Sequence, residues 1–317
     1  MAGRQRGARS GAAGGRLRAL LTSPYLLLAG AAFFWSTNMV VGRGAHELIP
    51  PIAFNFWRWL LALLILLPLT WRDLLRRRAV ILRHWRILGA LALTGISVFH
   101  SFIYLGLSRS PAINGLLLFA TSPLFFVLLA WLTAGERLRP AQGVGILLSL
   151  AGTALVIAQG DPAALLGLRF APGDLWLLAG VILWAGYSVL LRRRPEDLPP
   201  LTLLAATVAI ALVLLLPLYG LELAAGARLQ VTAASLASLA YVALFPSVLA
   251  YVFWNRGVRE AGAARAGITL QLMPVFGALL AVVFLGERLA AYHWLGGALV
   301  MSGILLAWLR SGGEDLD

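Results

Sequence analysis

The sequence contains no cysteine and no lysine, and charged residues make up only 12% of its 317 residues. Without cysteine the chain can form no disulfide, no thiolate nucleophile and no cysteine-ligated metal centre. A soluble domain carries about 25% charged residues, so this chain has too little polar surface for a water-facing fold. Disorder is excluded because its signature is low hydrophobicity, whereas 60% of these residues are hydrophobic and the mean hydropathy is +0.85. The composition predicts a chain solvated mostly by lipid.

Patterns that enzymes and ATP-driven pumps require are missing as well. The sequence has no Gly-x-Ser-x-Gly, no clustered histidines and no phosphate-binding loop. Catalysis within a membrane needs a nucleophile, a metal or an acid–base pair, and a primary pump needs a nucleotide site. We therefore expect neither an enzyme nor a pump, and no cofactor or metal.

Runs of about 20 apolar residues, the length that crosses a bilayer as a helix, recur along the whole chain. They fall at residues 24–42, 50–71, 87–107, 111–134, 140–158, 174–191, 199–219, 233–255, 266–285 and 291–309. The connections between them are too short to hold a soluble domain. The first run could instead be a signal peptide, since arginines precede it, but it is longer than a typical signal core. We expect one all-α membrane domain of ten transmembrane helices.

All 26 basic residues are arginine, and they lie at the ends of the apolar runs rather than in a groove-binding patch. With the N-terminus inside, 20 arginines fall on the inner side and 5 on the outer side, and Arg58 remains within a span. Cytoplasmic loops carry the excess of basic residues. The asymmetry predicts a multi-pass protein of the bacterial inner membrane with both termini in the cytoplasm, and it indicates no nucleic-acid partner.

Two stretches of the chain repeat one another. Residues 112–138 read AINGLLLFATSPLFFVLLAWLTAGERL, and residues 263–289 read AARAGITLQLMPVFGALLAVVFLGERL. This offset is 151 residues, and an offset of 149 relates the preceding helices. The matched pairs are Pro123 and Pro274, the two Gly-Glu-Arg-Leu runs at 135–138 and 286–289, Trp35 and Trp184, and Pro50-Pro51 and Pro199-Pro200. A shared four-residue run with a proline at matched depth is far more specific than shared hydrophobicity.

The repeat divides the chain into halves of five helices. We expect an arginine-rich cytoplasmic tail at 1–23, a first repeat at 24–158, a second repeat at 172–310 and a cytoplasmic tail at 311–317. Because five is odd, the second half runs through the membrane in the opposite sense. Inverted repeats are typical of secondary transporters, which bind substrate at the midplane between the halves. A duplication kept only for packing is the alternative.

These residues resemble the drug/metabolite transporter superfamily, specifically its EamA-type members with two five-helix repeats. The resemblance covers about residues 24–310. It rests on the two Pro…Gly-Glu-Arg-Leu segments, Trp-Ser-x-Asn at 35–38, Arg58 after the Pro-Pro helix start, and Tyr-Leu-Gly-Leu at 104–107. It implies a basket-like fold of ten helices around a central cavity, and export of amino acids or similar small metabolites. The shared residues are largely structural, so the resemblance does not specify the substrate.

Polar and aromatic side chains within the spans predict the substrate pathway, because such side chains usually face the bundle interior. The residues that we expect to line the cavity are Trp35, Asn38, His100, Tyr104, Trp184, Tyr187 and Tyr251. Apolar walls with a few polar groups suit a small ligand that has an apolar or aromatic body. Tryptophan and tyrosine also form interfacial belts, and we assign Trp59 and the other tryptophans nearer the span ends to such belts or to packing.

Arg58 is the one charged residue well inside a span. It could bind a substrate carboxylate or tie its helix to neighbouring backbone carbonyls. We favour the structural role, because the matched position in the second half is Thr207 and a charge within the membrane needs local partners.

Other residues predict bends and gates. Pro123 and Pro274 predict helix kinks, which in transporters often line the cavity; a static kink is the alternative. Glu136 and Glu287, expected at opposite membrane faces, are candidate gates, although charges at span ends are more often solvated caps.

Small residues at Gly145, Ser149 and Gly152 share one face of their helix. Such a face lets two helices approach closely. We interpret it as packing within the molecule, with a dimer contact as the less favoured interpretation.

No carboxylate lies in the middle of any span, so the usual group for proton or sodium coupling is missing. We expect facilitated diffusion or exchange of neutral or aromatic amino acids, by a monomer or weak dimer whose partners are its small-molecule substrate and membrane lipid. Proton antiport through His100, a residue that titrates near neutral pH, is the alternative. A lipid scramblase or membrane scaffold would share the spans but would not require opposed polar faces inside.

Overall fold

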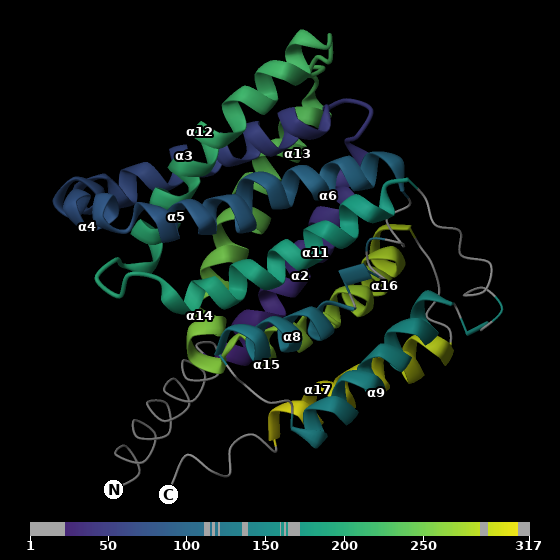
Figure 1. The fold of residues 1–317 in the computed structure, drawn as a ribbon. Helices are drawn as coiled ribbons and strands as arrows, with labels where there is room; N and C mark the ends of the chain where they lie inside the picture. The colour runs from purple at the N-terminus through teal and green to yellow at the C-terminus, as the bar shows by residue number, and fades with distance from the viewer. Residues whose placement is uncertain are drawn as a thin grey trace, which may run out of the picture.

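The computed structural model describes residues 23–110, 115, 118–119, 121–134, 139–158, 160–161, 163, 172–285 and 291–309. In these ranges every regular element is a helix, and the helices form ten consecutive spans (Figure 1). Six spans are long and apolar enough to cross a membrane: Pro24–Gly44, Pro51–Arg76, Trp85–Arg109, Asp174–Arg193, Pro200–Ala224 and Ala233–Ala261. Shorter apolar helices include Ser122–Thr133, Pro140–Leu155 and Trp294–Leu306. The predicted all-α membrane fold is confirmed.

The first half contains five spans. They are α2 (Pro24–Gly44), α3 (Pro51–Arg76), the run from α5 (Trp85–Ala92) through the π-helical segment η1 (Leu93–Ser97) to α6 (Val98–Arg109), α8 (Ser122–Ala134) and α9 (Pro140–Ile157). The short helix α4 (Arg78–Arg83) connects α3 to α5. Proline begins α2, α3 and α9, where its fixed φ suits the first helical residue and its missing N–H costs no hydrogen bond.

The second half repeats this order. It contains α11 (Asp174–Leu190) with a 3₁₀ turn η2 (Leu191–Arg193), α12 (Pro200–Ala224), the run from α13 (Ala233–Val242) through the π-helical segment η3 (Ala243–Leu249) to α14 (Ala250–Ala261), the pair α15 (Ala263–Thr269) and α16 (Leu272–Leu285), and α17 (Ala291–Leu309).

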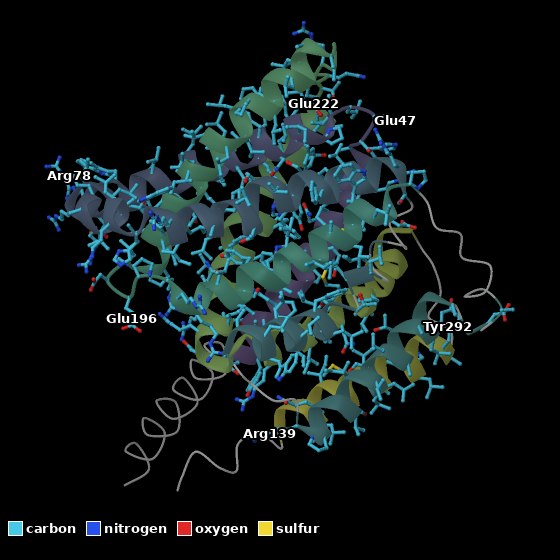
Figure 2. All side chains as sticks on the ribbon, viewed as in Figure 1. Glu47, Arg78, Arg139, Glu196, Glu222 and Tyr292 are labelled. Carbon is cyan, nitrogen blue, oxygen red and sulfur yellow. The ribbon has the colours of Figure 1, made fainter. Side chains whose placement is uncertain are left out.

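Helix contacts are related by exchange of the two halves. The first span of the first half, α2, packs on α14 in the third span of the second half. The equivalent contact, with the halves exchanged, is that of α11 with α6. The second helices of the halves, α3 and α12, pack on each other, as do the fifth helices, α9 and α17, at one edge of the bundle (Figure 1). Figure 2 shows the connections alternating between two ends: Glu47, Glu222 and Tyr292 lie at one end, and Arg78, Arg139 and Glu196 at the other. The two inverted five-helix repeats are therefore present.

Three spans are less regular than the sequence indicated. The third and eighth spans each contain a π-helical segment, η1 and η3, near mid-length. Pro123 and Pro274, predicted to kink continuous helices, instead lie at the second position of α8 and the third position of α16, where new helices begin. Proline lacks an N–H and is tolerated in a first turn, so the ninth span is interrupted between α15 and α16 rather than bent.

The pairing of α9 with α17 depends on small residues. A Cβ atom added to Gly152 would lie 2.6 Å from the carbonyl oxygen of Gly296, and one added to Gly303 would lie 2.4 Å from that of Gly145. The Ser149 hydroxyl donates to the Val300 carbonyl at 3.2 Å. The small-residue face therefore packs within the molecule, against its own copy in the second repeat.

Replacing Gly152 with alanine should lower the thermal stability of the detergent-purified protein, because the new methyl group meets backbone atoms that cannot move aside. Overpacking of this kind costs about 1–3 kcal/mol. Gly89→Ala is the matched control: it lies in α5 with no heavy atom within 4 Å of an added Cβ, and alanine has the higher helix propensity. Equal melting temperatures for the two variants would contradict the close α9–α17 packing.

Candidate functional site

Aromatic rings from both repeats meet at the centre of the protein. Trp35 of α2 and Trp184 of α11, the repeat-related tryptophans, meet edge to face with ring centroids 4.8 Å apart. The ring of Tyr251, on α14, lies 5.9 Å from that of Trp35 and 5.5 Å from that of Trp184. All three side chains are buried. Edge-to-face contacts suit the charge distribution of aromatic rings, so these rings form a stable wall.

A small cavity of about 20 Å³ adjoins this wall. It has room for a water-sized group, so a larger ligand requires the surrounding helices to move apart. Its lining comes from both repeats and consists of Trp35, Asn38, Met39, Phe99, His100, Ile103, Phe119, Trp184 and Met273. Ligand sites for small organic molecules are mostly apolar with a few placed polar groups. The lining has this character, and its two strongly polar side chains are Asn38 and His100.

Each repeat contains one tyrosine–asparagine hydrogen bond at the same place, but the tyrosine of one repeat occupies the position of the asparagine in the other. In the first repeat, Tyr104 of α6 donates to the Oδ1 atom of Asn38 of α2 at 3.0 Å. The equivalent bond in the second repeat runs from Tyr187 of α11 to the Oδ1 atom of Asn255 of α14 at 2.8 Å. The offsets of 149 and 151 relate Asn38 to Tyr187 and Tyr104 to Asn255. Each repeat thus joins its first and third spans by one buried polar bond.

The π-helical segments supply backbone acceptors to the aromatic wall. Trp35 Nε1 donates to the Pro246 carbonyl in η3 at 3.1 Å, and the Tyr251 hydroxyl donates to the Gly95 carbonyl in η1. In a π-helical turn the backbone bonds shift from the i+4 to the i+5 residue, which leaves some carbonyls free of their usual partner, and such segments are frequent at functional sites. Gly95 also leaves room for the Tyr187 ring, because a Cβ atom added to Gly95 would lie 2.2 Å from that ring.

Arg58 is fully buried at the edge of this region. Its Nε atom donates to Ser247 of η3 at 2.9 Å, and its Nη1 atom donates to Asn38 at 3.3 Å and to the Tyr104 hydroxyl. The guanidinium carbon also lies 5.2 Å from the Trp59 ring centroid. Every one of these partners is neutral, and no ion pair involves Arg58 in the described part of the chain. Burial of an arginine at mid-membrane costs at least about 2.5–3.5 kcal/mol.

Several buried donors near the centre have no acceptor among the described residues. They are Arg58 Nη2, Trp59 Nε1 and Trp184 Nε1. On the same helix as Arg58, the Oδ1 atom of Asn55 is an acceptor without a donor, while its Nδ2 atom donates to Ser97 and Ser101. An unmade buried hydrogen bond costs about 1–3 kcal/mol. The site therefore has unused capacity to donate hydrogen bonds.

The residues predicted for the cavity lie together in the structure. Trp35, Asn38, His100 and Trp184 line the cavity, and Tyr104, Tyr187 and Tyr251 lie behind them in hydrogen-bond or ring contact with the lining. The candidate gates Glu136 and Glu287 lie outside the described residues.

Sequence reasoning missed two residues of this region and placed a third too vaguely. Trp59 belongs to no interfacial belt: it is fully buried and contacts His100 and Tyr251, with ring centroids 5.5 and 5.0 Å away. Trp254 and Ser247 were not considered, yet both are buried at the centre. Ser247 had no counterpart in the sequence, because neither repeat offset relates it to Ser97. The hydroxyls of Ser97 and Ser247 each donate to the carbonyl five residues earlier.

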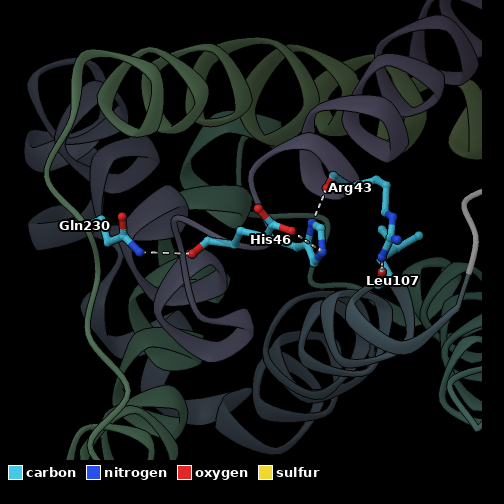
Figure 3. Close-up of polar contacts among 5 residues, drawn as sticks. Arg43, His46, Leu107 and Gln230 are labelled. Atoms are coloured by element: carbon cyan, nitrogen blue, oxygen red, sulfur yellow. Dashed lines mark hydrogen bonds and ion pairs between the residues drawn. The ribbon is translucent and has the colours of Figure 1, made fainter.

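At the end of the molecule where Glu47 and Glu222 lie, α12 is bonded to the start of α3. The Glu222 carboxylate accepts from the backbone amides of Ile52 at 2.9 Å and Ala53 at 2.6 Å, so it caps a helix N-terminus with negative charge. Figure 3 shows Gln230 donating to the Glu47 carbonyl at 3.2 Å and Arg43 donating to the Leu107 carbonyl at 2.8 Å at this same end. The Glu222 and Gln230 contacts bind the two repeats together, and the Arg43 contact lies within the first repeat.

The opposite end lacks the corresponding cap. The repeat offset of 149 relates Glu222 to Asp73 and the amides of Ile52 and Ala53 to those of Leu201 and Thr202. Among the described residues no hydrogen bond joins Asp73 to the start of α12; the contact between the repeats there is Arg77 donating to the Asp197 carbonyl. The two ends of the α3–α12 pair are thus in different states.

Two inverted five-helix repeats that enclose a polar and aromatic cavity define a membrane transporter. The family comparison agrees: the EamA-like transporter family matches residues 22–158 and again residues 171–309. The chain belongs to that family.

Individual relatives are similar over most of the chain. The uncharacterized transporter YyaM of Bacillus subtilis is 28% identical over 89% of this chain and 92% of its own. A probable terminal-alkyne amino-acid exporter of Streptantibioticus cattleyicolor is 30% identical over 70% of this chain and 72% of its own. A solved crystal structure with 24% identity superposes with a TM-score of 0.72, over 91% of this chain and 97% of that chain, and has the same fold.

Replacing Trp35 with phenylalanine should destabilise the detergent-purified protein, because the Pro246 carbonyl loses its donor in a buried site. The expected loss is about 1–3 kcal/mol of unfolding free energy, measured by thermal unfolding. Trp71→Phe is the control, since Trp71 is 49% exposed on the outer surface. A Trp35→Phe variant as stable as Trp71→Phe would contradict the role given to this hydrogen bond.

Proposed function

We propose that this membrane transporter exports neutral or aromatic amino acids, or related small metabolites with an apolar body, across the bacterial inner membrane. The observation that carries the proposal is the aromatic lining of the cavity between the repeats. The rings of Trp35, Phe99 and Trp184 offer an apolar surface to a substrate side chain once the small cavity widens. The relative named as an amino-acid exporter supports this substrate class.

The orientation follows from the arginines. The end of the molecule where Arg78, Arg139 and Glu196 lie carries the arginine-rich connections (Figure 2). Cytoplasmic loops carry the basic excess, so we assign this end, and with it both termini, to the cytoplasm. Glu47 and Glu222 then lie at the outer end.

Transport by facilitated diffusion or exchange fits the lack of a carboxylate in the middle of the spans. Proton antiport is the second candidate, favoured by the position of His100 in the cavity lining. In proteoliposomes, uptake that increases with an imposed pH gradient, and that loses this increase in His100→Gln, would support antiport over facilitated diffusion.

Counterflow of radiolabelled amino acids into proteoliposomes tests the function itself. We expect the purified protein to exchange at least one of phenylalanine, tryptophan, leucine and methionine. Trp184→Ala should reduce this exchange about tenfold or more, because the ligand loses a stacking wall worth about 1.4 kcal/mol or more. Trp176→Ala is the matched control on the same helix, since Trp176 is 37% exposed. A wild-type protein that exchanges none of a broad panel of amino acids and metabolites would leave a scramblase or scaffold as the better account.

Alternating access requires two states that the inverted halves can exchange. The unequal ends of the α3–α12 pair supply a physical basis for it. In the state described here Glu222 caps α3. In the opposite state, Asp73 would cap the start of α12, and Glu222 would release α3. The two carboxylates would then act as alternate latches of one equilibrium.

Removing each latch should shift that equilibrium in opposite directions. Because the chain has no cysteine, a Met39→Cys variant reports access to the cavity lining through a single thiol. Labelling by a membrane-impermeant maleimide from the outer side should rise about threefold to tenfold in Glu222→Ala and fall in Asp73→Ala. Glu196→Ala, which removes an exposed carboxylate, should leave the rate unchanged. A shift in the same direction for both latch variants would contradict the alternate-latch account.

A further inference from the structure

We infer that Arg58 and Asn38 together bind the carboxylate of the transported molecule, so that the protein selects small organic acids and zwitterions over the corresponding amides and amines. This inference rests on the proposed function, whose substrate class it narrows. The sequence alone favoured a structural role for Arg58, and the contacts made by the side chain reverse that preference.

The positive charge of Arg58 has no counter-charge among the residues that the structure describes. The side chain is fully buried, and its protein partners are the neutral groups of Ser247, Asn38 and Tyr104. A guanidinium has five N–H donors in a planar fork that matches the two oxygens of a carboxylate. Here the Nη2 atom, with two of these donors, meets no acceptor in the ranges that the structure describes. A buried cation with an unused edge is a site for an anion.

Asn38 connects this edge to the cavity. Its orientation is determined by its neighbours, because arginine can only donate and Arg58 Nη1 donates to the Oδ1 atom of Asn38. The Nδ2 group is therefore the free end of the amide, and it makes no hydrogen bond within the described chain. Asn38 lines the cavity, with Trp35 one turn earlier on the same helix. An anion at Arg58 can thus be continuous with an apolar body that packs against the tryptophans.

The unused groups favour one acidic head and exclude a cationic one. Trp184 Nε1, in the cavity lining, and Trp59 Nε1, beside Arg58, are further donors without acceptors. A ligand ammonium would be repelled by Arg58, whereas a carboxylate would accept from these groups. A single guanidinium matches the single charge of a carboxylate better than the double charge of a phosphate ester.

The fold does not need an arginine at this place. The equivalent residue of the second repeat is Thr207, whose hydroxyl bonds the Leu203 and Leu204 carbonyls of its own helix. The tyrosine–asparagine bond between Tyr187 and Asn255 forms there without a cation. The arginine therefore adds a charge to the first repeat only, whereas the tyrosine–asparagine bonds are present in both repeats.

Ligand-induced thermal stabilisation of the detergent-purified protein tests this inference without requiring transport. The probes are L-phenylalanine, phenylacetate and L-phenylalaninamide, which share a ring but differ in the carboxylate. We expect the two acids to bind at least about tenfold more tightly than the amide, as a charge-assisted hydrogen bond implies. Arg58→Gln should abolish the preference, and Arg58→Lys should retain part of it. Arg72→Gln, which removes an exposed arginine from the same helix, should leave it unchanged.

Asn38→Asp provides a second variant that does not leave the arginine unpaired. It places a carboxylate beside Arg58, so we expect a higher melting temperature and loss of the acid preference. An acid preference that survives in Arg58→Gln or in Asn38→Asp would overturn the inference, as would chloride or acetate stabilising the wild type as strongly as phenylalanine. If counterflow of amino acids is intact but acid and amide bind equally, this inference alone fails. If no panel member is exchanged, the proposed function fails whatever the binding preference.

Discussion

A buried cation, Arg58, that meets no counter-charge in the described part of the chain is the constraint around which the centre of this protein is arranged. Arg58 lies where water is excluded, so its hydrogen bonds must come from the protein or from a ligand. Three spans from both repeats supply them, through Asn38 of α2, Tyr104 of α6 and Ser247 of the π-helical segment in the eighth span. A change in the relative position of the repeats therefore alters the surroundings of the charge, and a ligand that completes those surroundings will bias the position of the repeats.

Symmetry and its exceptions have separate roles in this account. The repeated features form the frame: the two central tryptophans, the exchanged tyrosine–asparagine bonds and the π-helical segments that offer carbonyls at equivalent places. We propose that the unequal features determine the direction of transport and the substrate selectivity. Arg58 has threonine as its counterpart, and the Glu222 cap has no formed counterpart at Asp73. An exact two-fold frame would bind substrate without distinguishing its ends.

The sequence was sufficient for the number of spans, their inverted repetition and most central side chains. Apolar run length, the Gly-Glu-Arg-Leu pair and the Trp35–Trp184 match predicted them. It could not reveal the π-helical segments, because an extra residue in one turn shifts the helix face by about 100° and spans that are apolar on nearly every face do not record such a shift. It also could not reveal the burial of Trp59, whose depth depends on packing between spans. The surroundings of Arg58 were out of reach for the same reason: its partners Ser247 and Tyr104 are distant in the chain, and only their geometry shows that one edge of the guanidinium meets no acceptor among the described residues.

The most direct test of the central claim is an experimental structure of the protein with 4-bromo-L-phenylalanine, in which anomalous scattering locates the bromine. The account predicts a carboxylate within about 3.2 Å of Arg58 Nη2 and Asn38 Nδ2, the range of a hydrogen bond, and a bromine peak beside the Trp35 and Trp184 rings. A ligand seated in the cavity with its carboxylate turned away from Arg58, or with its amino group against it, would contradict the account.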